Sequence, residues 1–285
     1  VFKSKTRAAN DPKNLAKKIL SRMQTLGYTS ASAYYQLLNE QTLASVQEWQ
    51  QLNQLLTNGE SFFFRDRGQF SLLKEQTLPE LIERRSAEKK LRLCSAGCAA
   101  GEEPYSLAIV LDQLLPHHHD WDEVIDGVDL NVGAIAKAKA GIYRPWSLRG
   151  LSDMHKAAYF QLEETATGEK RFHLGTQYRK YVQFHPLNLV QDSLAITTEG
   201  EGEEDPLFDL IVCRNVFIYL TKDAITKVLQ KFYHALRPGG YLLTGHAELY
   251  EQNLERFTMK SFPDSLIFQR PEQNRPEQTN FEQAK

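Results

Sequence analysis

The sequence predicts an α/β protein built on a parallel sheet, with an N-terminal helical domain and a small inserted antiparallel β-subdomain. Three observations lead to this prediction. Apolar residues recur at helical spacing up to residue 60, short apolar runs alternate with helical segments from Leu91 onward, and the stretch Tyr159–His185 breaks that alternation. A regular alternation of strands and helices favours a parallel sheet with helices on both faces.

The N-terminal region, residues 12–60, is predicted to be a small helical domain that follows a flexible N-terminus, residues 1–11. Its breaks fall at Gly27, at the Thr29–Ser32 cluster, which suits a helix N-cap, and at Asn58–Gly59. Residues 61–90 are expected to form a linker and a connecting helix. The apolar positions that indicate the helices are Leu15, Ile19, Met23, Leu26, Tyr34, Leu37, Leu38, Val46, Trp49, Leu52, Leu55 and Leu56.

The sheet domain is predicted over residues 91–270. Its strands are expected in the apolar runs Leu91–Cys94, Glu123–Val128, Val182–Phe184, Phe208–Cys213 and Tyr241–Thr244. Within it, residues 159–185 lack a long apolar helix and carry a turn signal at Thr167–Gly168, so we expect an antiparallel insertion there. Residues 271–285 contain the end of a repeated Arg-Pro-Glu-Gln motif and little to bury, which predicts a disordered tail.

The composition excludes several classes of function. The 34 Lys+Arg and 36 Asp+Glu leave a net charge of −2, whereas a nucleic-acid binder needs concentrated positive charge. No apolar run approaches the ~20 residues of a membrane span. Three cysteines cannot form a disulfide framework, and the adjacent His117–His119 side chains point in different directions, which predicts no metal site. We therefore expect a cytoplasmic, monomeric enzyme without membrane insertion.

The segment after the first predicted strand has the features of a ligand-binding loop. Gly97 and Gly101 allow a tight turn and a close approach of a ligand to the backbone, and Pro104 opens the next helix. The glycine spacing fits neither a dinucleotide fingerprint nor a P-loop. Glu102 and Glu103 would repel a pyrophosphate but could pair with hydroxyls or with a cationic ligand. The loop therefore predicts a cofactor without phosphates.

Asp129 ends the second predicted strand, where an acid is placed to bind both hydroxyls of a ribose held by the first loop. The alternative is that Asp129 or Asn131 only caps the following helix, which starts near Val132. The neighbouring glycine loop favours the ribose role. A nucleoside without phosphates and with a positive centre describes S-adenosylmethionine.

Further polar residues are predicted at the same edge of the sheet. Arg65 follows three phenylalanines, and its guanidinium could bind a substrate carboxylate. Arg214 and Asn215 end the fourth strand, and Tyr219 follows four residues later, although it could be an ordinary interface aromatic. Asn188 closes the third strand, where its amide could meet the rim of an adenine.

Six motifs, in this order, resemble those of the chemotaxis-receptor glutamate methyltransferase family. They are Glu-Ser-x-Phe-Phe-Arg-Asp (60–66), Ser-Ala-Gly-Cys-Ala-Ala-Gly-Glu-Glu-Pro-Tyr-Ser (95–106), Gly-Ile-Tyr (141–143), Pro-Leu-Asn-Leu (186–189), Cys-Arg-Asn-Val-x-Ile-Tyr (213–219) and Leu-Arg-Pro-Gly-Gly-Tyr-Leu (236–242). The resemblance covers residues 12–270. It implies a Rossmann-like methyltransferase sheet together with the helical domain and the β-subdomain.

The resemblance also implies the cofactor, S-adenosylmethionine with its product S-adenosylhomocysteine, and the residues that bind it. Arg65 and Tyr219 are the implied catalytic positions, on either side of the transferred methyl. Gly59 and Ser61 stand where the family often has Asn-x-Thr, and Asn131 stands where a second acid would follow Asp129. The cofactor-binding residues are taken as Ser61, Arg65, Gly97, Glu103, Asp129, Asn188, Leu189, Arg214 and Asn215.

The function implied by the resemblance is transfer of a methyl group from S-adenosylmethionine to glutamate side-chain carboxylates of chemotaxis-type receptors, which gives glutamate methyl esters. One alternative is a methyltransferase that acts on a small molecule, a nucleic acid or another non-receptor substrate. Another is a sensor that binds the cofactor without turnover. The glycine spacing and the paired glutamates disfavour a nicotinamide dehydrogenase.

The expected partner is the cytoplasmic domain of a chemotaxis-type receptor, and two regions are candidates for holding it. The insertion at residues 159–185 could add a receptor strand at its edge, or it could cover the substrate side of the cleft. Residues 1–22 hold Lys and Arg side chains in excess over a single acid, Asp11. This excess could steer an acidic receptor to the enzyme, or it could be an ordinary solvated helix face.

Overall fold

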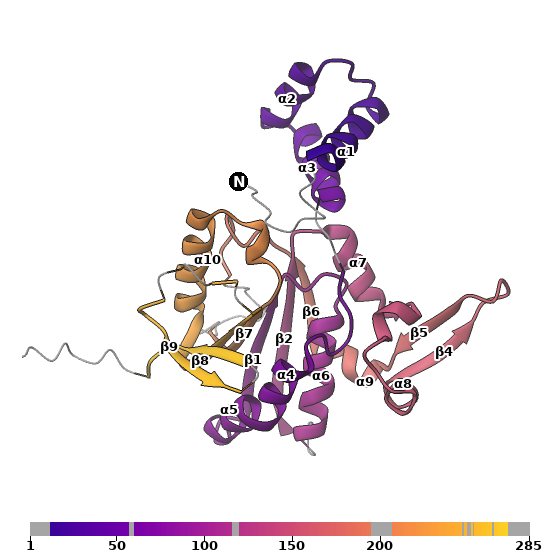
Figure 1. Ribbon diagram of the computed structural model, residues 1–285. Helices are drawn as coiled ribbons and strands as arrows, with labels where there is room; N and C mark the ends of the chain where they lie inside the picture. The colour runs from indigo at the N-terminus through magenta and orange to yellow at the C-terminus, as the bar shows by residue number, and fades with distance from the viewer. Residues whose placement is uncertain are drawn as a thin grey trace, which may run out of the picture.

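The structure is a computed structural model that describes residues 12–56, 60–115, 120–194, 207–246, 248–249, 252, 254–263 and 265–272. Predictions for residues 1–11, Gly59, His117–His119 and residues 273–285 of the expected tail lie outside the described residues. A helical bundle, coloured indigo, stands above a larger domain that is organised around a central sheet, and a β-hairpin projects from the side of that domain (Figure 1).

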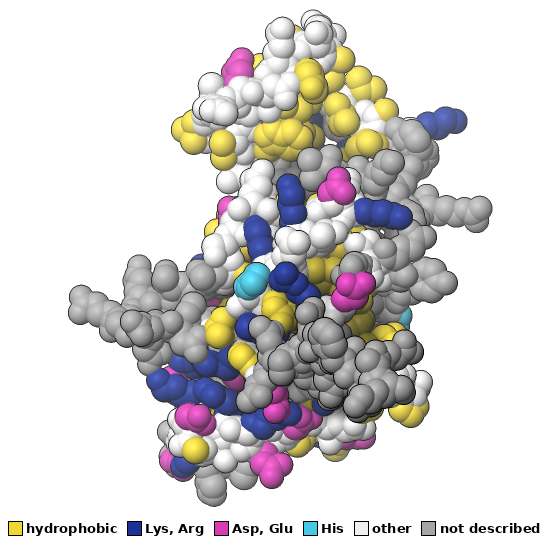
Figure 2. Space-filling model, turned by 90° about the vertical axis from the view of Figure 1, so that its left-hand side faces the viewer, with side chains coloured by type: hydrophobic (Ala, Val, Ile, Leu, Met, Phe, Trp, Pro, Cys, Tyr) yellow, Lys and Arg dark blue, Asp and Glu magenta, His cyan; other side chains and the backbone are white. Residues whose placement is uncertain are grey.

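The N-terminal bundle contains α1 (Pro12–Thr25), α2 (Ala31–Asn39) and α3 (Leu43–Leu56). α2 begins after Ser30, whose side chain accepts a hydrogen bond from the N–H of Ala33, as an N-cap serine does. The buried core of the bundle is small and consists of Met23, Tyr34 and Leu52. Many other apolar side chains stay exposed, and Figure 2 shows hydrophobic side chains gathered over this part of the molecule.

The central sheet has seven strands in the order β6-β2-β1-β7-β8-β10-β9. Neighbouring strands from β6 to β8 pair in parallel, and β10 and β9 add an antiparallel edge. The strands are β1 (Lys90–Ala96), β2 (Asp122–Asp129), β6 (Val182–Pro186), β7 (Phe208–Cys213), β8 (Leu236–Thr244), β9 (Thr258–Phe262) and β10 (Ser265–Gln269). All five predicted apolar runs form strands of this sheet, and the predicted α/β fold class is confirmed.

Helices cover both faces of the sheet. Adjacent strand residues such as Leu93 and Cys94, or Leu210 and Ile211, belong to two separate hydrophobic clusters, because successive side chains of a strand point to opposite faces. One cluster includes residues of α4 to α7, and the other includes residues of α10. The helices are α4 (Arg67–Leu72), α5 (Leu78–Arg84), α6 (Glu102–Leu114), α7 (Val132–Ala140) and α10 (Lys222–Ala235), with a π-helical turn, Leu73–Thr77, between α4 and α5.

A second sheet of three antiparallel strands, in the order β3-β5-β4, is inserted between α7 and β6. Its region contains β3 (Ile142–Tyr143), a 3₁₀ turn (Pro145–Leu148), α8 (Asp153–Tyr159), β4 (Phe160–Glu164), β5 (Lys170–Leu174) and α9 (Thr176–Arg179). The inserted sheet therefore begins before the predicted span 159–185, and β6, which begins inside that span and ends at Pro186, belongs to the central sheet. The β4–β5 hairpin turns at Gly168, whose φ of +78° favours glycine.

The C-terminal part differs from the sequence prediction in two ways. β8 starts at Leu236 rather than at Tyr241, because the chain leaves α10 directly in an extended conformation, with a register shift opposite Phe208 and Leu210. The hairpin of β9 and β10 was not predicted, and β9 is an edge strand with little burial, so its sequence carries a weak signal. None of the helices in the described ranges has both the length and the apolar character needed to span a bilayer.

Candidate active site

A cavity of about 910 Å³ lies at the carboxyl ends of β1, β2, β6 and β7, which is where parallel α/β sheets bind ligands. α3 contributes Val46, Trp49 and Gln50 to its lining, so the helical bundle forms part of the wall. Every residue that the sequence assigned to cofactor binding or catalysis lines this cavity: Ser61, Arg65, Gly97, Glu103, Asp129, Asn188, Leu189, Arg214, Asn215 and Tyr219. The fold thus brings five distant segments of the chain to one place.

The loop after β1 makes the tight turn that its glycines predict. The N–H groups of Gly97 and Cys98 both donate to the carbonyl of Val128, at 2.7 and 3.0 Å, and this draws the loop onto the end of β2. Gly97 has a φ of +84°, and a Cβ there would lie 2.2 Å from Cγ2 of Val216. Only glycine therefore fits between the β1 loop and the loop that follows β7.

Asp129 lies at the end of β2 with both carboxylate oxygens facing backbone donors. Oδ2 accepts from the N–H of Ala99 at 2.9 Å, and Oδ1 accepts from the N–H of Asn131 at 2.7 Å. Burial raises the pKa of Asp129, and the two backbone hydrogen bonds oppose that rise. Each oxygen has a second lone pair for a ligand hydroxyl. The helix-cap role belongs to Asn131, whose Oδ1 accepts from the N–H of Ala134 at 3.0 Å at the start of α7.

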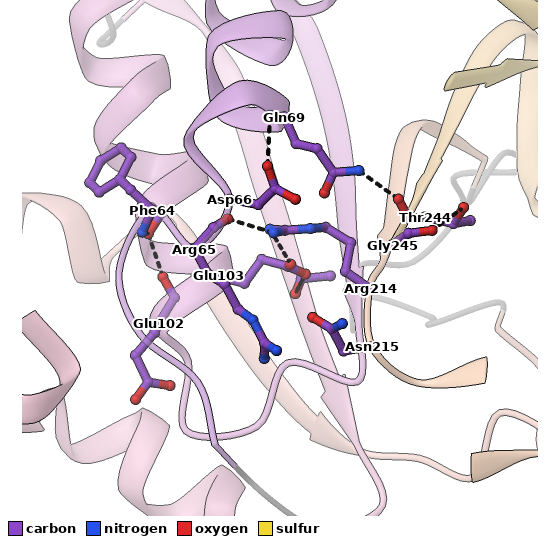
Figure 3. Close-up of polar contacts among 12 residues, drawn as sticks. Phe64, Arg65, Asp66, Gln69, Glu102, Glu103, Arg214, Asn215, Thr244 and Gly245 are labelled. Carbon is purple, nitrogen blue, oxygen red and sulfur yellow. Dashed lines mark hydrogen bonds and ion pairs between the residues drawn. The ribbon is translucent and has the colours of Figure 1, made fainter. Parts of the chain in front are cut away.

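Arg214 joins three segments of the site. Its Nη1 donates to Oε2 of Glu103 at 3.1 Å, and its Nη2 donates to the backbone carbonyl of Arg65 (Figure 3). The other oxygen of Glu103 accepts from the hydroxyl of Ser95 at 2.8 Å. The Arg214 side chain is only 3% exposed and that of Glu103 14%, so this is a nearly dry ion pair. Nε of Arg214 is buried with no hydrogen-bond partner among the described residues.

Glu102 does not line the cavity, contrary to the expectation that both glutamates belong to the site. It is 3% exposed and faces the insertion, where its Oε1 accepts from the hydroxyl of Ser147 at 3.0 Å. Burial raises its pKa, and hydrogen bonds from Ser147 and Ser61 oppose the rise. Glu102 therefore fastens the segment that leads to Arg65, while Glu103 points into the cavity.

Arg65 and Tyr219 reach the cavity from opposite loops. Nη1 of Arg65 donates to the carbonyl of Glu60 at 3.0 Å, and its guanidinium carbon lies 5.9 Å from the centre of the Phe62 ring. Within the described ranges, no Asp or Glu forms an ion pair with Arg65. Tyr219 ends a 3₁₀ turn (Phe217–Tyr219) after β7. Among the described residues that line the cavity, Arg65 is therefore a cation without a carboxylate partner.

Asn188 and Leu189 follow β6 in a tight turn. Oδ1 of Asn188 accepts from the N–H groups of Val190 and Gln191, at 3.0 and 3.3 Å, and its own N–H donates to Asp192 at 2.8 Å. The amide oxygen is therefore engaged within the turn, and the amide NH₂ is the group suited to a ligand acceptor. Leu189 adds an apolar surface beside it.

The loops of the site are stabilised by further residues that the sequence analysis does not assign to it. Nε2 of His246 lies 2.6 Å from Oδ2 of Asp66, and the buried Gln69 donates to the carbonyl of Thr244 at 2.7 Å. Glu248 accepts from the N–H of Asn215 at 2.8 Å. The sequence signal for His246 and Glu248 is position alone, because both follow β8 at the same edge of the sheet.

The fold and the cavity define a Rossmann-like domain with a site for a nucleoside cofactor. The site contains a carboxylate at the end of β2, a glycine turn that leaves no room for a side chain, and a buried Glu–Arg pair. These features suit a ribose and a zwitterionic group better than a phosphate. Among the described residues, no group of His, Cys, Asp and Glu is arranged to hold a metal ion. All three cysteines are buried, and burial raises the pKa of each thiol.

Comparisons with known proteins identify the family. Residues 59–265 match the model described as "CheR methyltransferase, SAM binding domain". The chain is 33% identical over 244 residues to a chemotaxis protein methyltransferase of Escherichia coli K12, with 85% of this chain and 78% of that protein covered. It is 29% identical over 262 residues to chemotaxis protein methyltransferase 2 of Vibrio cholerae, with 92% and 86% covered. The chain belongs to the CheR methyltransferase family.

Membership of this family confirms three predictions. The chain is an enzyme, its cofactor is S-adenosylmethionine, and its function is the methylation of receptor glutamates that characterises the family. Membership of the family does not support the three alternatives, which were a nicotinamide dehydrogenase, a non-catalytic sensor and a methyltransferase with a non-receptor substrate. The roles of individual residues stay predictions.

Proposed function

We propose that methyl transfer to a receptor glutamate takes place in the cavity at the carboxyl edge of the sheet. The observation that carries this proposal is the convergence on one cavity of the ribose acid Asp129, the Glu103–Arg214 pair and the cation of Arg65. S-adenosylmethionine supplies a sulfonium methyl that a carboxylate can displace. The residues of the chain bind the two reactants and orient them.

In this proposal, each part of the cofactor has its own partner. Asp129 accepts hydrogen bonds from the ribose hydroxyls, and Asn188 and Leu189 flank the adenine. Glu103 and Arg214 hold the charged amino-acid end, because the pair offers both an acceptor for an ammonium and a donor for a carboxylate. Gly97 lets the β1 loop approach closely, and Ser61 and Asn215 complete the lining.

The substrate carboxylate needs orientation rather than activation. A glutamate has a pKa of about 4.3, so it is ionised at neutral pH and requires no general base. The absence of a carboxylate partner for Arg65 among the described residues supports a role for its guanidinium in holding the nucleophile, with Tyr219 on the other side. Attack cancels two opposite charges, so strong binding of the ion pair would slow the reaction, and orientation is the favourable contribution.

A labelling experiment tests the proposed function. The chain is incubated with S-adenosylmethionine labelled in its methyl group and with the cytoplasmic fragment of a chemotaxis receptor. We expect base-labile label on glutamate side chains, located by mass spectrometry. A receptor fragment with glutamine at the modified positions is the matched control and should stay unlabelled. Label in a base-stable product would contradict glutamate esterification.

The β4–β5 hairpin supports docking of a receptor segment by strand addition. β4 is an edge strand of the small sheet, four of its five residues are exposed, and no residue of β4 or β5 lines the cavity. Deletion of the turn at residues 165–168 is expected to lower receptor methylation at subsaturating receptor. Affinity for S-adenosylhomocysteine, measured by calorimetry, should not change. If receptor methylation and affinity for S-adenosylhomocysteine fell equally, the turn would instead have a role in folding.

The basic side chains of α1 support electrostatic steering of an acidic receptor. Lys13 and Lys17 are exposed on α1, whereas Lys18 donates to the carbonyl of Leu55 at 2.6 Å and helps to hold the bundle. Charge reversal of Lys13 and Lys17 is therefore expected to lower the apparent second-order rate constant of methylation. The difference from the wild-type enzyme should shrink as added salt shortens the Debye length from ~10 to ~3 Å. A wild-type rate and salt slope would show that the helix is an ordinary solvated face.

A further inference from the structure

Glu248 lies in the turn after β8, outside the cavity lining, yet its carboxylate points at the loop that carries Asn215 and Tyr219. Oε2 accepts from the N–H of Asn215 and from that of Gly245, both at 2.8 Å. Burial raises the pKa of Glu248, and backbone N–H groups of the loop oppose that rise. This mostly buried carboxylate thus accepts two main-chain hydrogen bonds through Oε2, whereas Oε1 is buried without a hydrogen-bond partner among the described residues.

The loop from Arg214 to Tyr219 begins with a residue in the left-handed conformation. Asn215 has a φ of +60°, which asparagine adopts more readily than any other residue except glycine. The 3₁₀ turn that follows leaves its first N–H groups without partners inside the turn, and the N–H groups of Phe217 and Ile218 act to lower the pKa of Glu248. On its other side the loop packs through Val216 against Gly97, where there is no space for a Cβ.

The end of β8 and the turn after it also contact the segment that carries Arg65, on the other side of the cavity. Nε2 of His246 lies 2.6 Å from Oδ2 of Asp66, the residue after Arg65. Gln69 of α4 donates to the carbonyl of Thr244 at 2.7 Å, next to the Arg214 and Asn215 side chains (Figure 3). This short segment, none of whose described residues lines the cavity, thus contacts both loops that carry the catalytic candidates.

We propose that Glu248 is a positioning residue for methyl transfer, which fixes the loop of Asn215 and Tyr219 through its backbone without touching either reactant. This proposal rests on the proposed function of the cavity. Of the proposed cofactor contacts, those of Asp129, Glu103 and Asn188 come from other strands. Arg214 and Asn215 belong to this loop, but Arg214 is also held by Glu103, so most of the cofactor contacts do not depend on Glu248. Loss of the carboxylate should therefore affect turnover more than cofactor binding.

The test compares Glu248→Gln with the wild-type enzyme. The amide has nearly the same shape and can keep an oxygen at the position of Oε2, but it removes the negative charge that strengthens the hydrogen bonds from Asn215 and Gly245, so we expect kcat to fall about tenfold or more. The affinity for S-adenosylhomocysteine should stay within about threefold of the wild-type value. Amide hydrogen exchange should accelerate in residues 214–219 and stay unchanged in residues 90–96 of β1. Glu83→Gln, an exposed carboxylate of α5, is the matched control and should leave every readout unchanged.

The outcomes are distinguishable. A wild-type kcat for Glu248→Gln overturns the proposal, and so does a fall in kcat that disappears when rates are corrected for the folded fraction. Glu248→Asp retains the charge on a shorter side chain, and it should recover part of kcat. If the wild-type enzyme itself gives no glutamate ester, the proposed function fails, whereas the hydrogen-exchange difference still reports whether Glu248 holds the loop.

Discussion

Replacement of Asp129 by alanine is expected to weaken the binding of S-adenosylhomocysteine by about a hundredfold or more. Two ribose hydroxyls lose a charged acceptor, and each such hydrogen bond contributes about 1.5–3 kcal/mol. The N–H groups of Ala99 and Asn131, which donate to this carboxylate at 2.9 and 2.7 Å, would also lose their acceptor. Calorimetric titration with S-adenosylhomocysteine measures the loss directly.

Two further variants separate ligand binding from loop structure. Asp129→Asn keeps one acceptor oxygen, so we expect a smaller loss of affinity than for alanine. Asp122→Ala removes an exposed carboxylate from the other end of β2, where it pairs with Arg92 at 2.7 Å, and should leave affinity unchanged. Unchanged affinity in Asp129→Ala would remove Asp129 from the site.

The fold could be predicted because its signals are local. Buried parallel strands appear as short apolar runs, so the runs that became β1, β2, β6, β7 and β8 were visible in the sequence. The β9–β10 hairpin is not predicted, because β9 is an edge strand with little burial and the apolar run of β10, Leu266–Phe268, has only three residues. The predicted start of β8 is too late, since Leu236–Gly240 has the composition of a helix stop, whereas Leu236 already pairs with Phe208 of β7 before a register shift that precedes Tyr241.

The residues that line the candidate site could be predicted from the sequence, but the residues that stabilise its loops could not. Gly97, Glu103, Asp129 and Arg214 follow strands, so their positions alone place them at one edge of the sheet. Which of two adjacent glutamates enters the cavity depends on the rotation of α6, and a single sequence does not give it. The contact of Glu248 with Asn215 joins residues 33 positions apart across two loops, and no local pattern records such a contact.

Replacement of Arg214 by methionine is expected to have the largest effect on the molecule, because it leaves the carboxylate of Glu103 nearly buried without its cation. Removal of one partner of such a pair costs about 3–5 kcal/mol of stability. The same change removes the hydrogen bond to the carbonyl of Arg65 and a guanidinium that lies 5.5 Å from the centre of the Phe70 ring. Denaturant unfolding should show the loss of stability, and calorimetry should show loss of S-adenosylhomocysteine binding.

A double variant distinguishes these two losses. Arg214→Met combined with Glu103→Gln has no unpaired charge, and glutamine can still accept from the hydroxyl of Ser95, so most of the stability should return. Affinity for S-adenosylhomocysteine should stay low, because neither the cation nor the carboxylate is present to bind the charged end of the cofactor. If stability does not return, packing against Phe70 rather than the unpaired charge causes the loss. If either variant binds the cofactor with wild-type affinity, the ion pair only holds the loops together and the charged end of the cofactor must be bound elsewhere in the cavity.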